Sequence, residues 1–231
     1  DISGTPSEVT AALVTPGSMV VVDDATVTIS GNPSVSELNA IAGATDGVVT
    51  AALADNLLLT NLISLTTNST DDITITVNDA DDTSLAATGL STLGLKTAGT
   101  VTVTNAVDIS GTPSEVTAAL VTPESKVDVN GAKVTIIGNL SVSELNAIAG
   151  ATTGVVTATL VANTLANLES LSTESTDYIT IVVNDAADTS LAPTDLRDLG
   201  LKTAGTVTVT NAVDISGTPS EVTAALVTPG S

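Results

Sequence analysis

The sequence contains no cysteine and no histidine, so it lacks side chains on which many enzymes depend. The absence of cysteine excludes disulfide bonds, thiolate metal sites and cysteine nucleophiles. The absence of histidine excludes an imidazole base and the Ser-His-Asp arrangement. Neighbouring carboxylates do occur, as at Asp71 and Asp72, but the second repeat copy described below does not keep these pairs. We therefore expect a protein that is not an enzyme.

Aromatic residues are almost absent, because there is no phenylalanine, no tryptophan and a single tyrosine, Tyr178. A hydrophobic fraction of 42% still allows a substantial core. This core must be made from valine, isoleucine, leucine, alanine and the methyl groups of threonine. Small, β-branched side chains fit regular stacked layers better than an irregular core, which normally depends on aromatic residues.

Basic residues are scarce, since five lysines and arginines stand against 26 aspartates and glutamates. The resulting formal net charge of −21 repels nucleic acid and anionic membranes, and it favours solubility and the binding of cations. No apolar run reaches the roughly 18 residues that a membrane-spanning helix requires. We expect no nucleic-acid partner and no membrane span.

The clearest positive feature is a repeat that begins at Asp1, Asp108 and Asp214, with spacings of 107 and 106 residues. Residues 1–18 and 214–231 are identical. Internal repetition of this kind takes precedence over a division into ordinary domains.

The repeat predicts the organisation of the chain. The predicted parts are a first copy at residues 1–107, a second copy at 108–213 and the start of a third at 214–231. Because the sequence begins and ends inside a repeat, we expect a window on a longer array, or a subunit that stacks end to end on copies of itself.

Each copy divides into four units with a mean length of about 26 residues, and each unit starts with a β-branched run. Threonine alternates with aliphatic residues in these runs, as at residues 26–29, and this period of two indicates strands with one packed and one wet face. The predicted core residues are Val27, Ile29, Val101, Val103, Val107 and Ile109 from the strand side, and Leu13, Leu38 and Ile41 from the helical side.

Short helices are predicted after several of these strands. Thr5, Pro6 and Glu8 supply a capping residue, a proline in the first turn and a glutamate three residues after the cap. Comparable capping residues stand at Ser34, Thr112, Ser141 and Thr218. Helices of about two turns are not stable alone, so they must pack on the strands.

The alternation of strand, turn and short helix predicts an α/β repeat solenoid of about 26 residues per coil, in which parallel strands stack coil on coil. The alternative is a series of immunoglobulin-like β-sandwich repeats, because a period of 107 residues is close to the length of such a domain. The capping boxes, the missing core aromatics and the finer period favour the solenoid.

Acidic turns suggest calcium sites, because hard cations prefer oxygen ligands. One such turn, residues 78–82, follows a predicted strand, and residues 184–188 are its counterpart in the second copy. The candidate ligands are Asp79, Asp81, Asp82, Asp185 and Asp188. The turn is not an EF-hand loop, and an Asx turn that caps the next helix is the alternative.

Three runs of sequence resemble the repeats of giant cell-surface proteins of marine cyanobacteria. These runs are VTVTNAVDISG at residues 101–111, SELNAIAGAT at 36–45 and YITIVVND at 178–185. The resemblance covers nearly the whole chain and implies secretion, a cell-surface or extracellular location and a structural role. It implies no functional residue, because these repeats carry no site motif.

The function that we expect is therefore structural, in a stiff rod, fibre or surface layer whose partner is another copy of the same array. The alternative from another class is an adhesin stalk or binding module that uses calcium for rigidity.

Overall fold

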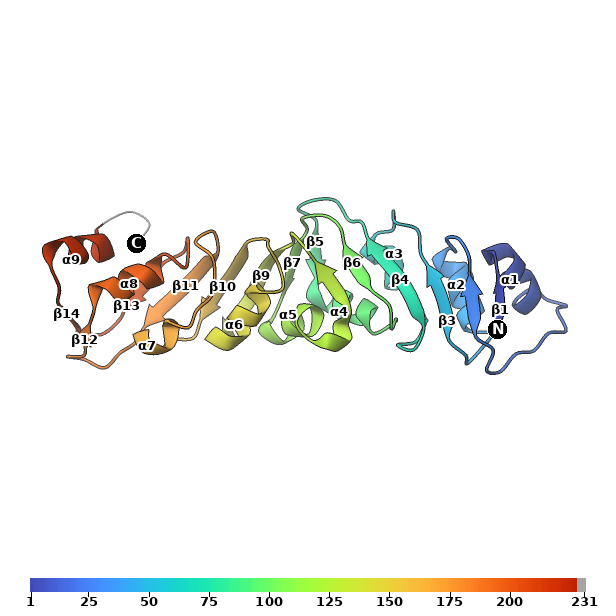
Figure 1. Cartoon of the computed structure of the whole chain (residues 1–231), viewed down its shortest axis with the longest axis horizontal. Coiled ribbons are helices and arrows are strands. Elements are labelled where there is room, and N and C mark those ends of the chain that lie inside the picture. The colour runs from blue at the N-terminus through green and yellow to red at the C-terminus, as the bar shows by residue number, and fades with distance from the viewer. Residues whose placement is uncertain (228–231) are drawn as a thin grey trace. The chain divides into compact units, whose positions relative to one another are not determined.

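The structure is a computed structural model, and it describes residues 1–227. It is a mixed α/β protein in which rows of parallel strands alternate along the chain with short helices (Figure 1). The chain divides into two compact units, the first formed by residues 1–109 and 118–132, and the second by residues 110–117 and 133–231. The units differ from the sequence copies, because residues 118–132 belong to the second copy but lie in the first unit.

The first unit contains a six-stranded sheet with the order β1-β2-β3-β4-β6-β8. Each strand pairs in parallel with a strand that follows it in the chain, and the paired residues are 22 to 26 positions apart. The strands are β1 (Ile2–Gly4), β2 (Val27–Ile29), β3 (Val49–Ala52), β4 (Asp72–Val77), β6 (Val101–Val103) and β8 (Val127–Val129). β5 (Ser84–Ala86) lies outside this sheet.

The second unit repeats this arrangement with the strand order β13-β11-β10-β9 and a further pair of strands, β12 and β14. Its strands are β9 (Lys133–Leu140), β10 (Val156–Leu160), β11 (Tyr178–Val183), β12 (Ser190–Leu191), β13 (Val207–Val209) and β14 (Asp214–Ile215). β7 (Asp108–Gly111) straddles the boundary between the units. The pairings within both units are parallel, so the immunoglobulin-like alternative is wrong, because its sheets are antiparallel.

The predicted capping boxes are present. Thr5 accepts a hydrogen bond from the backbone N–H of Glu8, and the Glu8 carboxylate accepts bonds from the backbone N–H and hydroxyl of Thr5. These bonds hold the pKa of Glu8 below its ordinary value of 4.5, and the bond from the Thr5 backbone has the larger effect. The pKa is lowered by matching bonds in Glu37, Glu115, Glu144 and Glu221.

The helices are α1 (Pro6–Leu13), α2 (Val35–Ala42), α3 (Leu59–Leu62), α4 (Ala87–Gly94), α5 (Pro113–Leu120), α6 (Val142–Ala149), α7 (Leu165–Leu168), α8 (Pro193–Gly200), α9 (Pro219–Leu226) and the 3-10 turn η1 (Pro123–Ser125).

The core consists of the inward side chains of the strands and the apolar faces of the helices. Eight of the nine predicted core residues are buried: Val27, Ile29, Leu38, Ile41, Val101, Val103, Val107 and Ile109. Leu13 is only half-buried, because it lies in α1, next to the first strand of the sheet order. Its counterpart in the second copy, Leu120, is buried.

Candidate functional site

The polar side chains of the interior form a repeated set of contacts between successive strands and turns. Asp71, which precedes β4, is only 3% exposed. One of its carboxylate oxygens accepts the backbone N–H of Val49 in the preceding strand at 2.8 Å, and the other accepts that of Asn68 in its own turn, also at 2.8 Å. Asp71 therefore joins the start of one strand to the start of the next.

A second buried aspartate caps a helix from a distance. Asp79 accepts the backbone N–H of Leu59, the first residue of α3, at 2.8 Å. The residue before it, Leu58, has no side-chain oxygen to act as a cap. The N–H groups at a helix start need an acceptor, and Asp79 supplies it from 20 residues further along the chain.

A threonine side chain completes the turn before the next strand. Thr97 Oγ1 accepts the N–H groups of Ile73 and Gly99 and donates toward the carbonyls of Asp71 and Ile73. A Cβ on Gly99 would lie 2.6 Å from the Ile73 carbonyl oxygen, so only glycine lets the two turns approach this closely. In the Thr-x-Gly sequence, the threonine therefore binds the backbone of the adjacent turn, and the glycine lets the two turns lie in direct contact.

Asparagines form the remaining contacts. Asn105 donates from its side chain to Asn78 Oδ1 at 3.0 Å and to the carbonyl of Asp79 at 2.6 Å. Asn39 bridges two backbone groups of a neighbouring turn, because it donates to Ser64 O and accepts from Thr66 N, both at 2.9 Å.

The same contacts recur in the second copy, made by Asp177, Asp185, Thr203, Asn211 and Asn146. Two copies that differ at many surface positions therefore keep one internal polar framework.

The five candidate calcium ligands are not gathered into one site. Asp79 and Asp185 are buried and bound to helix N–H groups. Asp81 accepts the N–H of Ala106 at 2.9 Å. Asp82 and Asp188 take left-handed backbone conformations, each with φ 61°. Within residues 1–227, no three histidine, cysteine, aspartate or glutamate side chains are grouped so that they could hold a metal ion.

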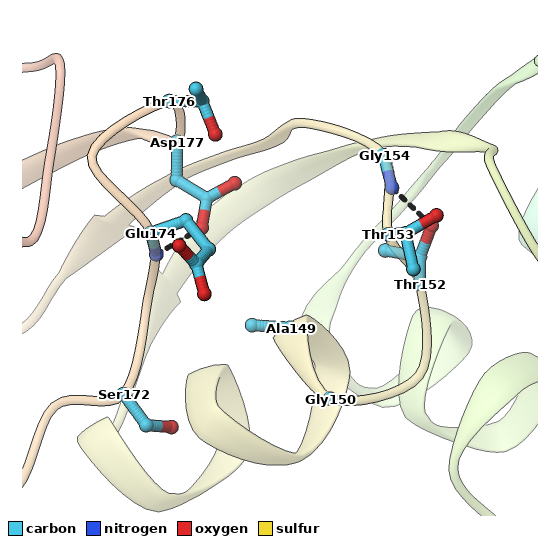
Figure 2. A pocket seen from close by; sticks show the side chains of 9 residues that line it. All are labelled: Ala149, Gly150, Thr152, Thr153, Gly154, Ser172, Glu174, Thr176 and Asp177. Carbon is cyan, nitrogen blue, oxygen red and sulfur yellow. Dashed lines mark hydrogen bonds between the residues drawn. The ribbon is translucent and has the colours of Figure 1, made fainter.

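A polar hollow lies between the turn after α6 and the turn before β11 (Figure 2). Its lining includes Thr152, Glu174 and Asp177, but the Asp177 carboxylate already accepts the N–H groups of Val156 and Glu174. The counterpart in the first copy has Asn68 in place of Glu174. The carboxylate of Glu174 is therefore not shared by the two copies.

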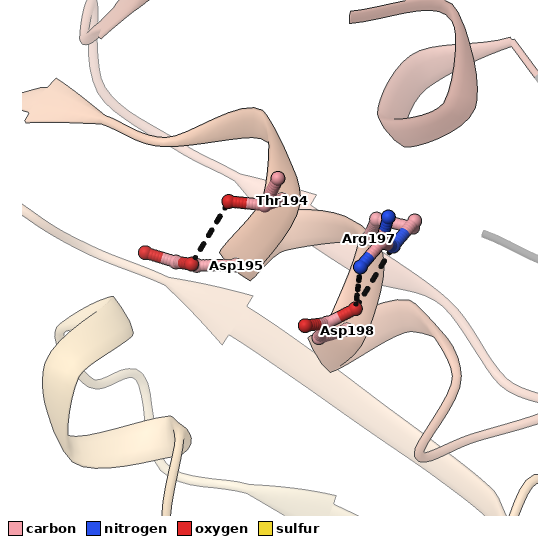
Figure 3. Close-up of polar contacts among 4 residues, drawn as sticks. All are labelled: Thr194, Asp195, Arg197 and Asp198. Atoms are coloured by element: carbon pink, nitrogen blue, oxygen red, sulfur yellow. Dashed lines mark hydrogen bonds and ion pairs between the residues drawn. The ribbon is translucent and has the colours of Figure 1, made fainter. Parts of the chain in front are cut away.

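The cationic groups of α8 and its C-terminal turn are also engaged in local contacts. The Arg197 guanidinium lies 2.5 Å from the carboxylate of its neighbour Asp198, and Thr194 donates to Asp195 at 3.1 Å (Figure 3). Both members of the ion pair are largely exposed, so it contributes about 0–1 kcal/mol. Lys202 donates to the carbonyls at residues 169 and 171, both at 2.6 Å.

Our reading of the sequence missed the internal framework, although the sequence contains a signal for it. Among the Thr-x-Gly sequences of the chain, those at residues 45–47, 97–99, 152–154 and 203–205 each have a glycine N–H that donates to the threonine hydroxyl. Aspartates directly before strands, at Asp71 and Asp177, stand at the same place in both copies. From the sequence, Asp71 is seen only as one of two neighbouring carboxylates, because burial cannot be read from an aspartate in a turn sequence.

Comparison with family models, with curated proteins and with solved structures finds no match to this chain. No helix among the described residues is long and apolar enough to cross a membrane.

Proposed function

We propose that the chain is a structural repeat segment of an extracellular or cell-surface protein, built as a solenoid of about 26 residues per coil. The observation that carries the proposal is the internal framework, in which buried aspartate and threonine side chains bind the backbone of an adjacent coil in both copies, and less buried asparagines add further contacts. The polar residues that an enzyme would present to a substrate are used here to hold coils together.

The strand pairing supports the solenoid. Val27 pairs with Val49, and Val101 pairs with Val127, so successive turns of the chain lie beside each other in one sheet. A short helix or turn returns the chain to the start of the next strand. With a strand spacing of about 4.8 Å, a copy of four coils adds roughly 20 Å to the array.

The proposed location and the lack of catalysis rest on the sequence. The absence of histidine and cysteine, together with a net charge of −21, supports a non-enzymatic protein without nucleic-acid partners. The resemblance to surface repeats of marine cyanobacteria supports an extracellular or cell-surface location. A stiff rod, fibre or surface layer is the role that fits these properties.

The solenoid is tested by small-angle X-ray scattering from the chain and from a chain lengthened by one further copy. We expect the maximum dimension to grow by roughly 20 Å while the cross-section stays constant. A cross-section that grows with the added copy would contradict a solenoid. The same measurement in EDTA tests the calcium-stiffened stalk, which would become more flexible without the ion.

The location is tested by immunoelectron microscopy of intact cells of the source organism with an antibody against residues 101–111. Label along filaments or a surface lattice is the expected result. Label confined to the cell interior would contradict the surface role.

A further inference from the structure

The sequence contains one Asn-Gly pair, Asn130-Gly131, which directly follows β8. In such a pair the side-chain amide and the next backbone nitrogen approach each other easily, because glycine has no Cβ to obstruct them. Asp23 and Asp24 occupy the same positions 107 residues earlier, in the first copy. The second copy therefore has a reactive pair where the first copy has two aspartates.

The structure leaves the reacting groups of this pair accessible. The Asn130 side chain is exposed, and a Cβ built on Gly131 would have no heavy atom within 4 Å beyond its chain neighbours. Within residues 1–227, the backbone N–H of Gly131 makes no hydrogen bond to another protein group. The nitrogen that would attack the side-chain amide is therefore neither bound nor packed against a neighbouring turn.

Buried residues hold the chain on both sides of the pair. Val129 is 3% exposed and pairs with Val103 of β6, and Ala132 is 1% exposed. The link between these two buried residues consists of Asn130 and Gly131 alone. Any change in the length of its main chain must be absorbed within two residues.

We propose that Asn130-Gly131 is a site of self-modification, at which the chain converts its own asparagine to aspartate or isoaspartate without an enzyme. The backbone nitrogen of Gly131 attacks Cγ of Asn130, the bond from Cγ to the side-chain nitrogen breaks, and ammonia leaves. Water then opens the resulting succinimide ring at either of its two carbonyl groups. Opening at one carbonyl gives aspartate, and opening at the other gives isoaspartate, whose main chain is longer by one carbon atom.

The two products have different consequences for the chain. Each adds one negative charge to a formal net charge of −21. Aspartate keeps the length of the main chain and gives the second copy the residue type that Asp23 supplies in the first. Isoaspartate lengthens the link between Val129 and Ala132, so its formation should disturb the end of β8. The inference is independent of the proposed structural function, which does not depend on this pair.

The chain contains a second pair of related sequence in a closed setting. Asp46 is exposed and precedes Gly47. The N–H of Gly47 donates to Thr45 Oγ1 at 3.0 Å, and a Cβ on Gly47 would overlap the carbonyl oxygen of Ala25. The substitution Asp46→Asn therefore supplies a matched Asn-Gly pair whose attacking nitrogen is already bound and packed.

Peptide mass spectrometry of the folded chain, incubated at mildly alkaline pH, tests the proposal. Trypsin cuts after Lys126 and Lys133 and releases the pair in the peptide VDVNGAK, in which conversion exchanges NH for O. In the Asp46→Asn chain, we expect conversion at Asn130 to be roughly tenfold faster than at position 46, because breaking the bond to Thr45 adds about 1.4 kcal/mol to the barrier. In guanidinium chloride the two rates should become similar. Equal rates in the folded chain, or no conversion at Asn130, would overturn the proposal.

Gly131→Ala provides the control at the site itself. The open space around Gly131 accepts a methyl group, so this variant should fold as the parent does. The added Cβ obstructs the attack, and conversion at Asn130 should slow by roughly tenfold or more. An unchanged rate would mean that water attacks the side-chain amide directly, and it would overturn the proposed self-modification.

Urea denaturation tests the consequence for β8. Asn130→Asp has the charge of the products and an unaltered main chain, so its urea midpoint should stay close to that of the parent. An incubated sample enriched in isoaspartate should unfold at a lower urea concentration. Equal midpoints for this sample and for Asn130→Asp would overturn the expected disturbance of β8.

Discussion

Replacing Asp71 with alanine tests the internal framework most directly. The carboxylate is 3% exposed and accepts two backbone N–H groups, each at 2.8 Å. Alanine leaves the buried N–H of Val49 without an acceptor, at a cost of about 1–3 kcal/mol, and removes the partner of the part-buried N–H of Asn68, at a cost of about 0.5–1.5 kcal/mol. We expect the free energy of unfolding of the first unit to fall by about 2–4 kcal/mol, a large part of the ~5–15 kcal/mol typical of a domain.

Urea denaturation followed by far-UV circular dichroism is the suitable assay, because the chain has no tryptophan. The control is Asp72→Ala, which removes a neighbouring but exposed carboxylate and should change stability by less than ~0.5 kcal/mol. Asp177→Ala should reproduce the Asp71 effect in the second unit, since its carboxylate makes the equivalent bonds at 2.7 and 2.9 Å.

The result that would refute this reasoning is a loss of less than about 1 kcal/mol in Asp71→Ala, or an equal loss in the Asp72 control. A small loss would mean that water or a shifted backbone group replaces the carboxylate. The buried aspartates would then be tolerated in the turns, and their hydrogen bonds would not be what holds one strand to the next.

Three further predictions follow from the packing and the caps. Gly99→Ala should cost about 1–3 kcal/mol, because its Cβ would overlap the preceding turn, whereas Gly131→Ala, with open space around it, should be nearly neutral in the same urea titration. Val103→Asp should cost about 3–5 kcal/mol because it buries an unpaired charge, while Thr28→Asp on the wet face should have little effect on the thermal midpoint. The capping glutamates have lowered pKa values, so their contribution is fully present above pH 4.5 and is lost as the pH falls through the folded-state values. A chain with all five changed to alanine should therefore be less stable than the parent at pH 7, and the difference in midpoint should shrink toward pH 3; a constant difference would contradict the linkage.

The sequence predicted the local elements well, because their signals are local. The alternation of threonine with aliphatic residues placed Val27 and Ile29 on the buried face. The capping residues located the starts of α1, α2 and α6, since a capping box needs only four residues in a row. The parallel α/β arrangement followed from the alternation of such strands and helices.

The polar framework could not be predicted in the same way, because its bonds join residues 20 to 29 positions apart. Asp79 was grouped with Asp81 as an oxygen ligand for calcium, on the basis of their proximity in the sequence. In the structure the Asp79 side chain faces the start of α3, and that of Asp81 faces Ala106. Which backbone group an acidic residue contacts depends on the register between paired strands, and the sequence of a single turn does not encode that register.

The framework also explains how a core without aromatic side chains can specify one register. An alternating strand of valine and threonine can slip by two residues and still bury the same kind of side chain. Such a slip would separate Asp71 from the N–H of Val49 and Thr97 from that of Ile73, and would leave those groups unpaired inside the protein. The inward valine and isoleucine side chains therefore supply most of the buried area, and the polar contacts select the register of the paired strands.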